Sequence, residues 1–175
     1  MTVAQVFASA GLTPSGPVHW KQPIVEPNEG VYVIARGGNA NLDYTPCELP
    51  LRNPLPAYIQ IDSDYESQRW LPNEPVVYIG KTDRRLERRI AQFYAHHCGD
   101  RSPHAGGQIL LLLTCDLWVY WSRSDHPQND ESTMLYAFEK TVGKAPFANF
   151  DRKRGLKRVR RLIDQREIRT FKSSG

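Results

Sequence analysis

The sequence predicts an α+β fold, in which a small central β-sheet of three strands, mixed or antiparallel, is flanked by helices. Three runs rich in β-branched and aromatic residues, at 30–35, 75–80 and 117–121, are typical of strands. Elsewhere, apolar residues recur with the spacing of amphipathic helices. A chain of 175 residues with 40% hydrophobic content can build one ordinary core, so a single domain over 1–175 is expected.

The N-terminal half contains two segments without strong periodicity. Residues 1–29 are rich in proline and glycine, which predicts an irregular arm with one short helix near 3–10. After the strand at 30–35, the turn-rich segment 36–75 is interpreted as an insertion between the first two core strands, with a short strand at 57–61. An insertion of this length is tolerable because loop-closure entropy grows only logarithmically with length.

The strand at 75–80 leads into a predicted helix over 82–94, with Thr82 or Asp83 as its N-cap. Its apolar stripe consists of Leu86, Ile90, Phe93 and Tyr94. A further helix is expected over 106–113, before the third strand at 117–121. Asp130 is a plausible N-cap for a later helix that ends at Gly143, and its apolar face consists of Met134, Leu135, Phe138 and Val142.

The net charge of +4 is unevenly distributed. Residues 151–175 carry ten Lys/Arg and three Asp/Glu, a net charge of +7, which leaves −3 for the first 150 residues. A basic extension with a helix over 155–169 is typical of proteins that bind a polyanion. A solvated, salt-bridged terminal helix is the alternative interpretation.

The remaining composition favours a soluble, cytoplasmic protein. The longest uninterrupted apolar run, 109–113, is far shorter than the ~20 residues that span a bilayer. No basic region followed by an apolar stretch marks a secretory signal. The three cysteines form no CxxC pair, so reduced thiols are expected.

Two of the predicted strands each place a tyrosine beside a glycine, in the segments Gly30-Val31-Tyr32 and Tyr78-Ile79-Gly80. The helix that follows the second segment is rich in arginine. Tyrosine hydroxyls can donate or accept hydrogen bonds, and guanidinium groups offer a planar fork of donors to phosphate oxygens. This combination suits chemistry on a phosphate group.

The pattern resembles the GIY-YIG nuclease family, over roughly 30–36 and 76–150. The positions that match the family's order are Tyr32, Tyr78, Arg89, His104, Glu131 and Asn149. The resemblance implies a metal-dependent endonuclease that hydrolyses DNA phosphodiester bonds, with a restriction-type enzyme as one subtype. In most relatives the two tyrosine strands form a hairpin with a short connection, whereas here about 40 residues separate them.

Glu131 is the metal ligand that the resemblance implies, for Mg²⁺ or Mn²⁺. The family pattern has apolar residues three and four positions later, and Met134 and Leu135 fit it. Glu139 is the competitor, followed at those positions by Val142 and Gly143. One carboxylate is sufficient in principle, because Mg²⁺ keeps most of its waters.

Two arginines compete for the catalytic position on the helix. The family pattern Leu-x-x-Arg selects Arg89, whereas direct counting from Tyr78 selects Arg88, and the two side chains point about 100° apart on a helix. The chosen arginine would stabilise negative charge in the transition state. The tyrosines would orient or deprotonate the attacking water, and a tyrosine base would need help from the metal or a nearby cation.

His104 would move a proton, and Asn149 would hold a strand end or a tyrosine hydroxyl. The expected phosphate or DNA contacts are Lys81, Arg84, Arg85, Arg88, Lys157, Arg158 and Arg161. The 36–75 insertion is expected either to read DNA bases or shape or to cover the sheet as a flap that buries its aromatic residues. The aromatic, amide and arginine side chains on which this expectation rests are Tyr44, Arg52, Asn53, Tyr58, Gln60, Arg69 and Trp70. A binding module without turnover and an RNA-directed nuclease stay open as alternatives.

Overall fold

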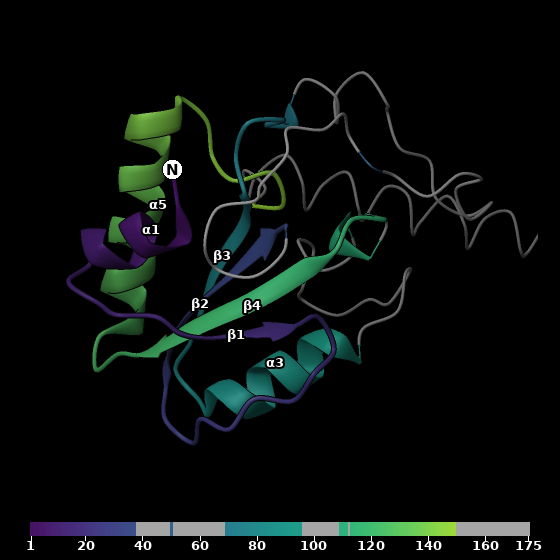
Figure 1. The fold of residues 1–175 in the computed structure, drawn as a ribbon. Coiled ribbons are helices and arrows are strands. Elements are labelled where there is room, and N and C mark those ends of the chain that lie inside the picture. The colour runs from purple at the N-terminus through teal and green to yellow at the C-terminus, as the bar shows by residue number, and fades with distance from the viewer. Residues whose placement is uncertain (38–49, 51–68, 96–108, 112, 150–175) are drawn as a thin grey trace, which may run out of the picture.

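The computed structural model describes residues 1–37, 50, 69–95, 109–111 and 113–149 (Figure 1). Within these ranges the chain has an α+β fold with a four-stranded antiparallel sheet and three longer helices. The helices are α1 (Val3–Ser9), α3 (Leu86–Tyr94) and α5 (Pro127–Val142). The strands are β1 (Ser15–His19), β2 (Gly30–Arg36), β3 (Val76–Thr82) and β4 (Leu117–Arg123).

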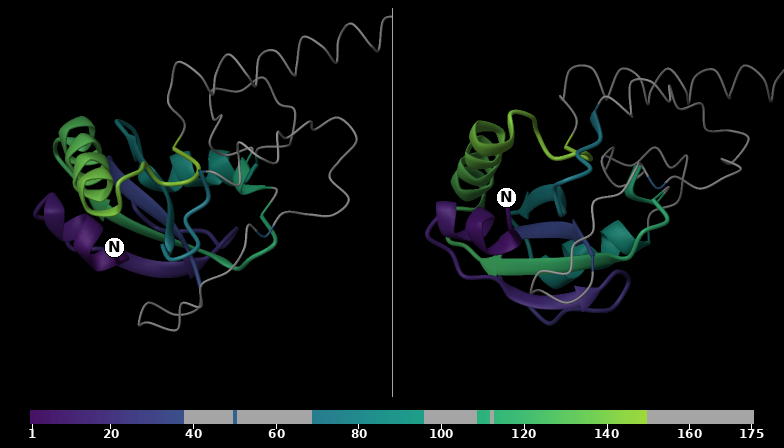
Figure 2. Two further views of the ribbon diagram at one scale, coloured as in Figure 1. Left: turned by 90° about the horizontal axis from the view of Figure 1, so that it is seen from above. Right: turned by 45° about the horizontal axis from the view of Figure 1, so that its top comes forward.

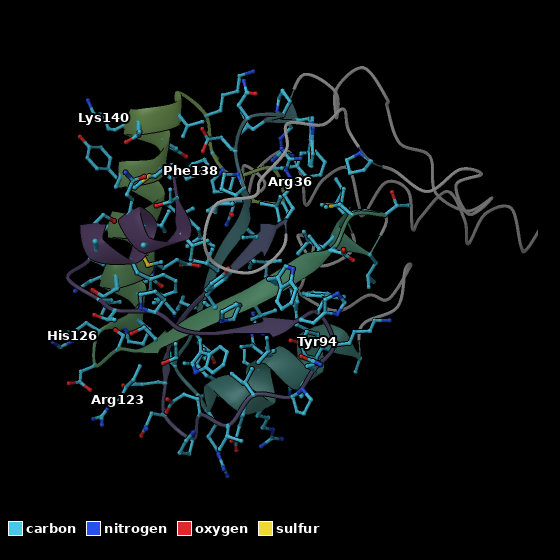
Figure 3. The ribbon with its side chains drawn as sticks, in the orientation of Figure 1. Arg36, Tyr94, Arg123, His126, Phe138 and Lys140 are labelled. Atoms are coloured by element: carbon cyan, nitrogen blue, oxygen red, sulfur yellow. The ribbon has the colours of Figure 1, made fainter. Side chains whose placement is uncertain are left out.

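The strand order in the sheet is β1-β4-β2-β3, so β2 and β4 are central and β1 and β3 are edges. The two tyrosine-bearing strands, β2 and β3, are direct antiparallel neighbours despite their separation in sequence. Along the other side of β2, Gly30 pairs with Arg123 and Arg36 pairs with Leu117. Accordingly, Figure 3 labels Arg36 and Arg123 at opposite ends of the sheet.

Each face of the sheet has its own core. On one face, α1 and α5 lie side by side (Figure 2), and α5 packs against β2 and β3. The apolar residues of this face include Val6, Phe7, Val31, Ile79 and Phe138. The other face packs against α3, and its core includes Tyr32, Ile34, Leu86, Ile90 and Phe93. Alternation along the strands therefore sends Val31 and Tyr32 into opposite cores.

A β-bulge in β3 changes this alternation next to the tyrosine. Ile34 pairs with Tyr78, but the next residue, Ala35, pairs with Val76, so Val77 has no opposite residue on β2. Val77 and Tyr78 consequently both lie on the α3 side of the sheet, whereas Val76 belongs to the other core. Bulges of this kind re-aim side chains near the point of insertion.

The prediction of three strands was wrong, because part of the N-terminal arm forms a fourth. Residues of β1 pair with β4 through Ser15–Trp121, Val18–Val119 and His19–Trp118. Gly16 and Pro17 conceal this strand in the sequence, since both residues are poor strand formers. Proline is tolerated here because β1 is an edge strand, where a missing N–H can face away from the sheet.

The predicted helix starts also need correction. Neither Thr82 nor Asp83 caps α3, which starts at Leu86 with Arg85 at its N-cap and no side-chain cap. Backbone carbonyls supply the cap instead, since Leu86 N donates to Asn28 O at 2.8 Å and Glu87 N donates to Glu26 O at 3.1 Å. Thr82 is still in β3, where it pairs with Gly30.

In the later helix, Asp130 is not the N-cap of α5. The N-cap is His126, and Pro127 occupies the first turn, where its missing N–H has no cost. The C-terminus was predicted correctly, because Gly143 ends α5 in the left-handed conformation at φ 85°.

Several other expectations are confirmed. The short N-terminal helix and the strands at 30–35, 75–80 and 117–121 all exist; each strand ends one or two residues later than predicted, and β3 begins one residue later, at Val76. The expected strand at 57–61 and the basic helix at 155–169 lie outside the described residues, as does most of the helix expected over 106–113. No helix in the described ranges is long and apolar enough to cross a membrane.

Candidate functional site

Tyr32 and Tyr78 face each other across the pair of strands β2 and β3. Tyr32 pairs with Gly80 and Ile34 pairs with Tyr78, so the two tyrosines are diagonal neighbours on the α3 side of the sheet. Their ring centroids are 5.8 Å apart and the rings are tilted by 41°. Two phenol groups from segments that are 46 positions apart in sequence are thereby brought into one cluster.

Gly80 leaves the space that the two rings occupy. A Cβ atom built on Gly80 would lie 2.6 Å from Tyr78 Cε1, 2.8 Å from Tyr32 Cζ and 2.9 Å from the Tyr32 hydroxyl oxygen. Real Cβ atoms essentially never approach other heavy atoms this closely. Any larger residue at position 80 would therefore displace the tyrosines.

Gly30 has a comparable role on β2, but its nearest neighbour is backbone. A Cβ atom there would lie 2.1 Å from Ser122 O and 2.8 Å from Leu86 Cδ1. Glycine at this position thus allows β4 and the start of α3 to pack closely against β2. Both glycines of the tyrosine motifs have a steric explanation in the fold.

Phe93 of α3 forms the inner wall of the tyrosine pair. Its ring stacks on Tyr78 at 5.5 Å with a 30° interplanar angle, and its edge meets Tyr32 at 6.1 Å and 70°. Trp20 also packs against Phe93, at 5.5 Å. Tyr32 is 1% exposed in this setting, whereas Tyr78 keeps some contact with solvent.

Arg89, rather than Arg88, acts on the tyrosines. The positive charge of Arg89 lowers the pKa of both hydroxyls, and its effect on Tyr32 is second only to that of burial. Arg89 is partly buried, whereas Arg88 is exposed. Of the two candidates, the structure therefore places Arg89 in the cluster.

Glu131 is the negatively charged residue that acts on the tyrosine pair, although α5 packs on the face of the sheet opposite α3. It is 8% exposed on α5, and its charge raises the pKa of both Tyr32 and Tyr78. Met134 is completely buried three positions later, as the family pattern implied. The competing Glu139 is exposed and lies about 12 Å farther along the helix axis.

Burial away from water is the largest cause of the pKa shifts of the two tyrosines. Burial is the largest cause that raises the pKa of Tyr32 above 10, with Arg89 opposing it. The pKa of Tyr78 is raised further, first by burial and then by the neighbouring Tyr32. Both phenols are therefore neutral near pH 7.

The hydrogen bonding of the Tyr32 hydroxyl is incomplete among the described residues. Its oxygen is buried, and no group in the described residues meets hydrogen-bonding geometry with it. Arg89 and Tyr78 nevertheless lie close enough to lower its pKa. A buried hydroxyl in this state is costly unless a water or ligand completes its hydrogen bonding.

Asn149 acts on the backbone of β3 and not on a tyrosine hydroxyl. Its side-chain Oδ1 accepts from Ile79 N at 2.8 Å, and its Nδ2 donates to Ile79 O at 2.7 Å. The amide thus continues the sheet ladder on the outer edge of β3, between Tyr78 and Gly80. Of the two roles considered for Asn149, holding a strand matches this geometry.

The predicted phosphate contacts are placed only in part. Lys81 forms an ion pair with Asp83, at 2.6 and 2.8 Å from its carboxylate oxygens, and Arg85 pairs with Glu87. Arg84, Arg85 and Arg88 are exposed around the start of α3. The remaining phosphate-contact candidates, Lys157, Arg158 and Arg161, lie outside the described residues, as does the predicted proton carrier His104.

A metal ion at this site would depend on Glu131. The described residues contain no group of three or more His, Cys, Asp or Glu side chains that could hold a metal. Mg²⁺ fits a single carboxylate because it retains several waters, and Mn²⁺ accepts the same ligands. The neutral phenols of Tyr32 and Tyr78 could hydrogen-bond waters of such an ion. The donor set therefore suits a hydrated cation.

The raised pKa values predict a loss of stability in alkali. Below about pH 10, the pKa of tyrosine in an unfolded chain, the two groups carry their protons in both states. Above that pH the unfolded chain loses protons that the folded chain retains, so the free energy of unfolding decreases. Tyr78→Phe removes one of these groups, and urea unfolding between about pH 9 and pH 11 should show a smaller decrease than in wild type. The control is Tyr136→Phe, since Tyr136 is 62% exposed, and an equal decrease in all three proteins would contradict the assignment.

Two contributors to the cluster were not identified from the sequence. Trp20 lies in the segment predicted to be irregular, so no pattern marked it. Phe93 was expected in the core, and it lies one helical turn after Arg89. Residues four positions apart share a helix face, so this spacing could have selected Arg89 over Arg88.

Comparisons with protein-family models, with curated proteins and with solved structures found no match to this chain.

Proposed function

We propose that this chain is a metal-dependent endonuclease that hydrolyses DNA phosphodiester bonds with a site of the GIY-YIG type. One observation carries the proposal: Tyr32 and Tyr78 lie against each other, and the charges of Arg89 and Glu131 both act on their hydroxyls. These four residues come from four different elements of the fold. Their convergence supports a site more strongly than the short sequence motifs do.

Each residue has a role in the hydrolysis. Glu131 would hold a hydrated Mg²⁺ or Mn²⁺, and the bound ion would polarise the phosphate and stabilise the leaving oxygen. Arg89 stabilises the charge that develops on the phosphate oxygens. A water attacks phosphorus and forms a new P–O bond, the P–O bond to the leaving oxygen breaks, and the proton that the water gives up passes to the leaving oxygen.

The tyrosines orient the attacking water. Because both phenols are neutral near pH 7, they first act through hydrogen bonds and not as bases. Arg89 favours the ionised form of both phenols, so either tyrosine would depend on this charge to act as a base. His104, as a candidate proton carrier, and the basic segment 151–175, as a candidate DNA-binding element, remain predictions of the sequence.

The test is cleavage of supercoiled plasmid by the full chain, with Mg²⁺ or Mn²⁺ and with EDTA. The proposal expects nicked or linear product with either metal and none with EDTA. DNA binding without cleavage would favour the module that has no turnover. Cleavage of RNA in preference to DNA would favour the RNA-directed enzyme. A restriction-type role would appear as a fixed fragment pattern.

A further inference from the structure

The outer edge of β3 is covered by the segment that follows α5. Ala148 N donates to Val77 O at 2.8 Å, and the Asn149 side chain pairs with both backbone groups of Ile79. Residues 148 and 149 thus occupy backbone groups on the strand that carries Tyr78. An edge strand that is covered in this way is also protected from pairing with other chains.

Arg69 holds this covering segment in place. Its Nη2 donates to Phe147 O at 2.7 Å and to Asn149 O at 3.1 Å, so one guanidinium joins both ends of the segment. Hydrogen bonds from a charged donor are stronger than those between neutral groups. Arg69 is 80 positions away from Asn149 in sequence, so this contact closes a large loop.

Trp70 supports Arg69 from the next position. Its ring meets Phe147 edge-on at 5.0 Å and 87°, and the guanidinium carbon of Arg36 lies 4.6 Å from the Trp70 ring centroid. Trp70 is 6% exposed and Phe147 is 1% exposed. The pair therefore belongs to the core. Arg69 and Trp70 are two of the insertion residues considered either for DNA contacts or for a covering flap, and their contacts with the body of the protein match the flap.

We infer that Arg69 is a positioning residue for the tyrosine pair, acting through Asn149 and the backbone of Ile79. The contacts are continuous: Arg69 binds the carbonyl of Asn149, the Asn149 side chain binds Ile79, and Ile79 lies directly between Tyr78 and Gly80. Loss of the guanidinium would release the segment, and β3 would then lose the hydrogen bonds that hold its outer edge. The consequence for catalysis rests on the proposed nuclease function.

The experiment compares Arg69→Met, Arg69→Lys and Arg123→Met in the full chain. Methionine keeps much of the apolar stem and removes every donor, whereas lysine keeps the charge but not the planar fork. Arg123→Met is the matched control, because Arg123 is exposed and pairs with Asp125. Amide hydrogen exchange of Ile79 and Ala148, measured by NMR, gives a readout that does not depend on activity.

In Arg69→Met we expect amide exchange at Ile79 and Ala148 to increase about tenfold or more. Exchange of the amides that join strand β1 to strand β4 should be unchanged. We also expect kcat for plasmid cleavage to decrease about 10²-fold while KM stays within about twofold, because only the position of a catalytic group has changed. Arg69→Lys should lie between Arg69→Met and wild type in both readouts. It also serves as the test if Arg69→Met does not fold.

The inference would be overturned if both Arg69 variants had the same amide exchange rates and the same kcat as Arg123→Met. A faster Ile79 amide with unchanged kcat would also overturn it, because the covering segment would then not position the tyrosines for the reaction. If wild type cleaves no nucleic acid, the proposed function fails, and the exchange data alone decide whether Arg69 positions β3.

Discussion

Replacement of Glu131 by glutamine is expected to reduce metal-dependent cleavage by about 10³-fold or more, the effect of losing a metal that contributes several kcal/mol. Glutamine preserves the size of the buried side chain and removes its charge, so the hydrated cation loses its carboxylate ligand. DNA affinity measured in EDTA should change little. Single-turnover cleavage with saturating enzyme measures the effect on the chemical step.

Glu139→Gln is the matched control for this prediction. Both glutamates lie on α5, but Glu139 is exposed and has no effect on the two tyrosines comparable to that of Glu131. Its replacement should leave the cleavage rate within about twofold, as surface substitutions usually perturb a protein little. Activity retained in Glu131→Gln and lost in Glu139→Gln would move the metal ligand to Glu139.

Replacement of Gly80 by alanine is expected to impair both folding stability and cleavage. The added methyl group would lie within 3 Å of both tyrosine rings, so the rings or β3 must move. Overpacking of this kind costs roughly 1–3 kcal/mol of unfolding free energy, and a displacement of about 1 Å at a catalytic group can cost 10²-fold in rate. Urea unfolding and single-turnover cleavage measure the two effects.

Gly143→Ala is the control for the loss of stability alone. Gly143 has a φ of 85°, and a methyl group added there would have no heavy atom within 4 Å, so alanine strains the backbone without a clash. That strain costs about 1 kcal/mol, and cleavage should be retained. Equal cleavage by the Gly80 and Gly143 variants at matched stability would contradict a steric role for Gly80 in the tyrosine pair.

Much of the fold follows from local patterns in the sequence. The β-branched runs predicted three strands correctly, and the stripe of Leu86, Ile90 and Phe93 predicted the buried face of α3. The fourth strand was hidden because its pairing with β4 compensates for Gly16 and Pro17. Tertiary contacts of this kind leave no periodicity in the strand itself.

Helix starts were less predictable for a related reason. The first N–H groups of α3 are satisfied by carbonyls of Asn28 and Glu26, which are 58 and 61 positions away. No residue type near the start of α3 indicates in the sequence that these distant carbonyls cap the helix. For α5 a signal was present, since Pro127 favours the first helical turn.

The candidate site was predictable in its residue types but not in its geometry. The two motifs identified Tyr32 and Tyr78, but the bulge at Val77 sets which residues of β3 face α3. Glu131 and Arg89 were each one of two candidates, and their effect on the tyrosines separates them from the competing glutamate and arginine. The role of Arg69 depends on backbone carbonyls near position 148, which a sequence pattern cannot indicate.

The most direct measurement is a Mn²⁺ titration of protein carrying ¹³C-labelled tyrosine, followed by NMR. Mn²⁺ broadens nearby nuclei steeply with distance, and Tyr→Phe variants assign the signals of Tyr32 and Tyr78. If Glu131 holds a cation beside the tyrosine pair, substoichiometric Mn²⁺ will broaden these two signals first in wild type and will not do so in Glu131→Gln. Uniform broadening of all tyrosine signals, or selective broadening that persists in Glu131→Gln, would contradict this site.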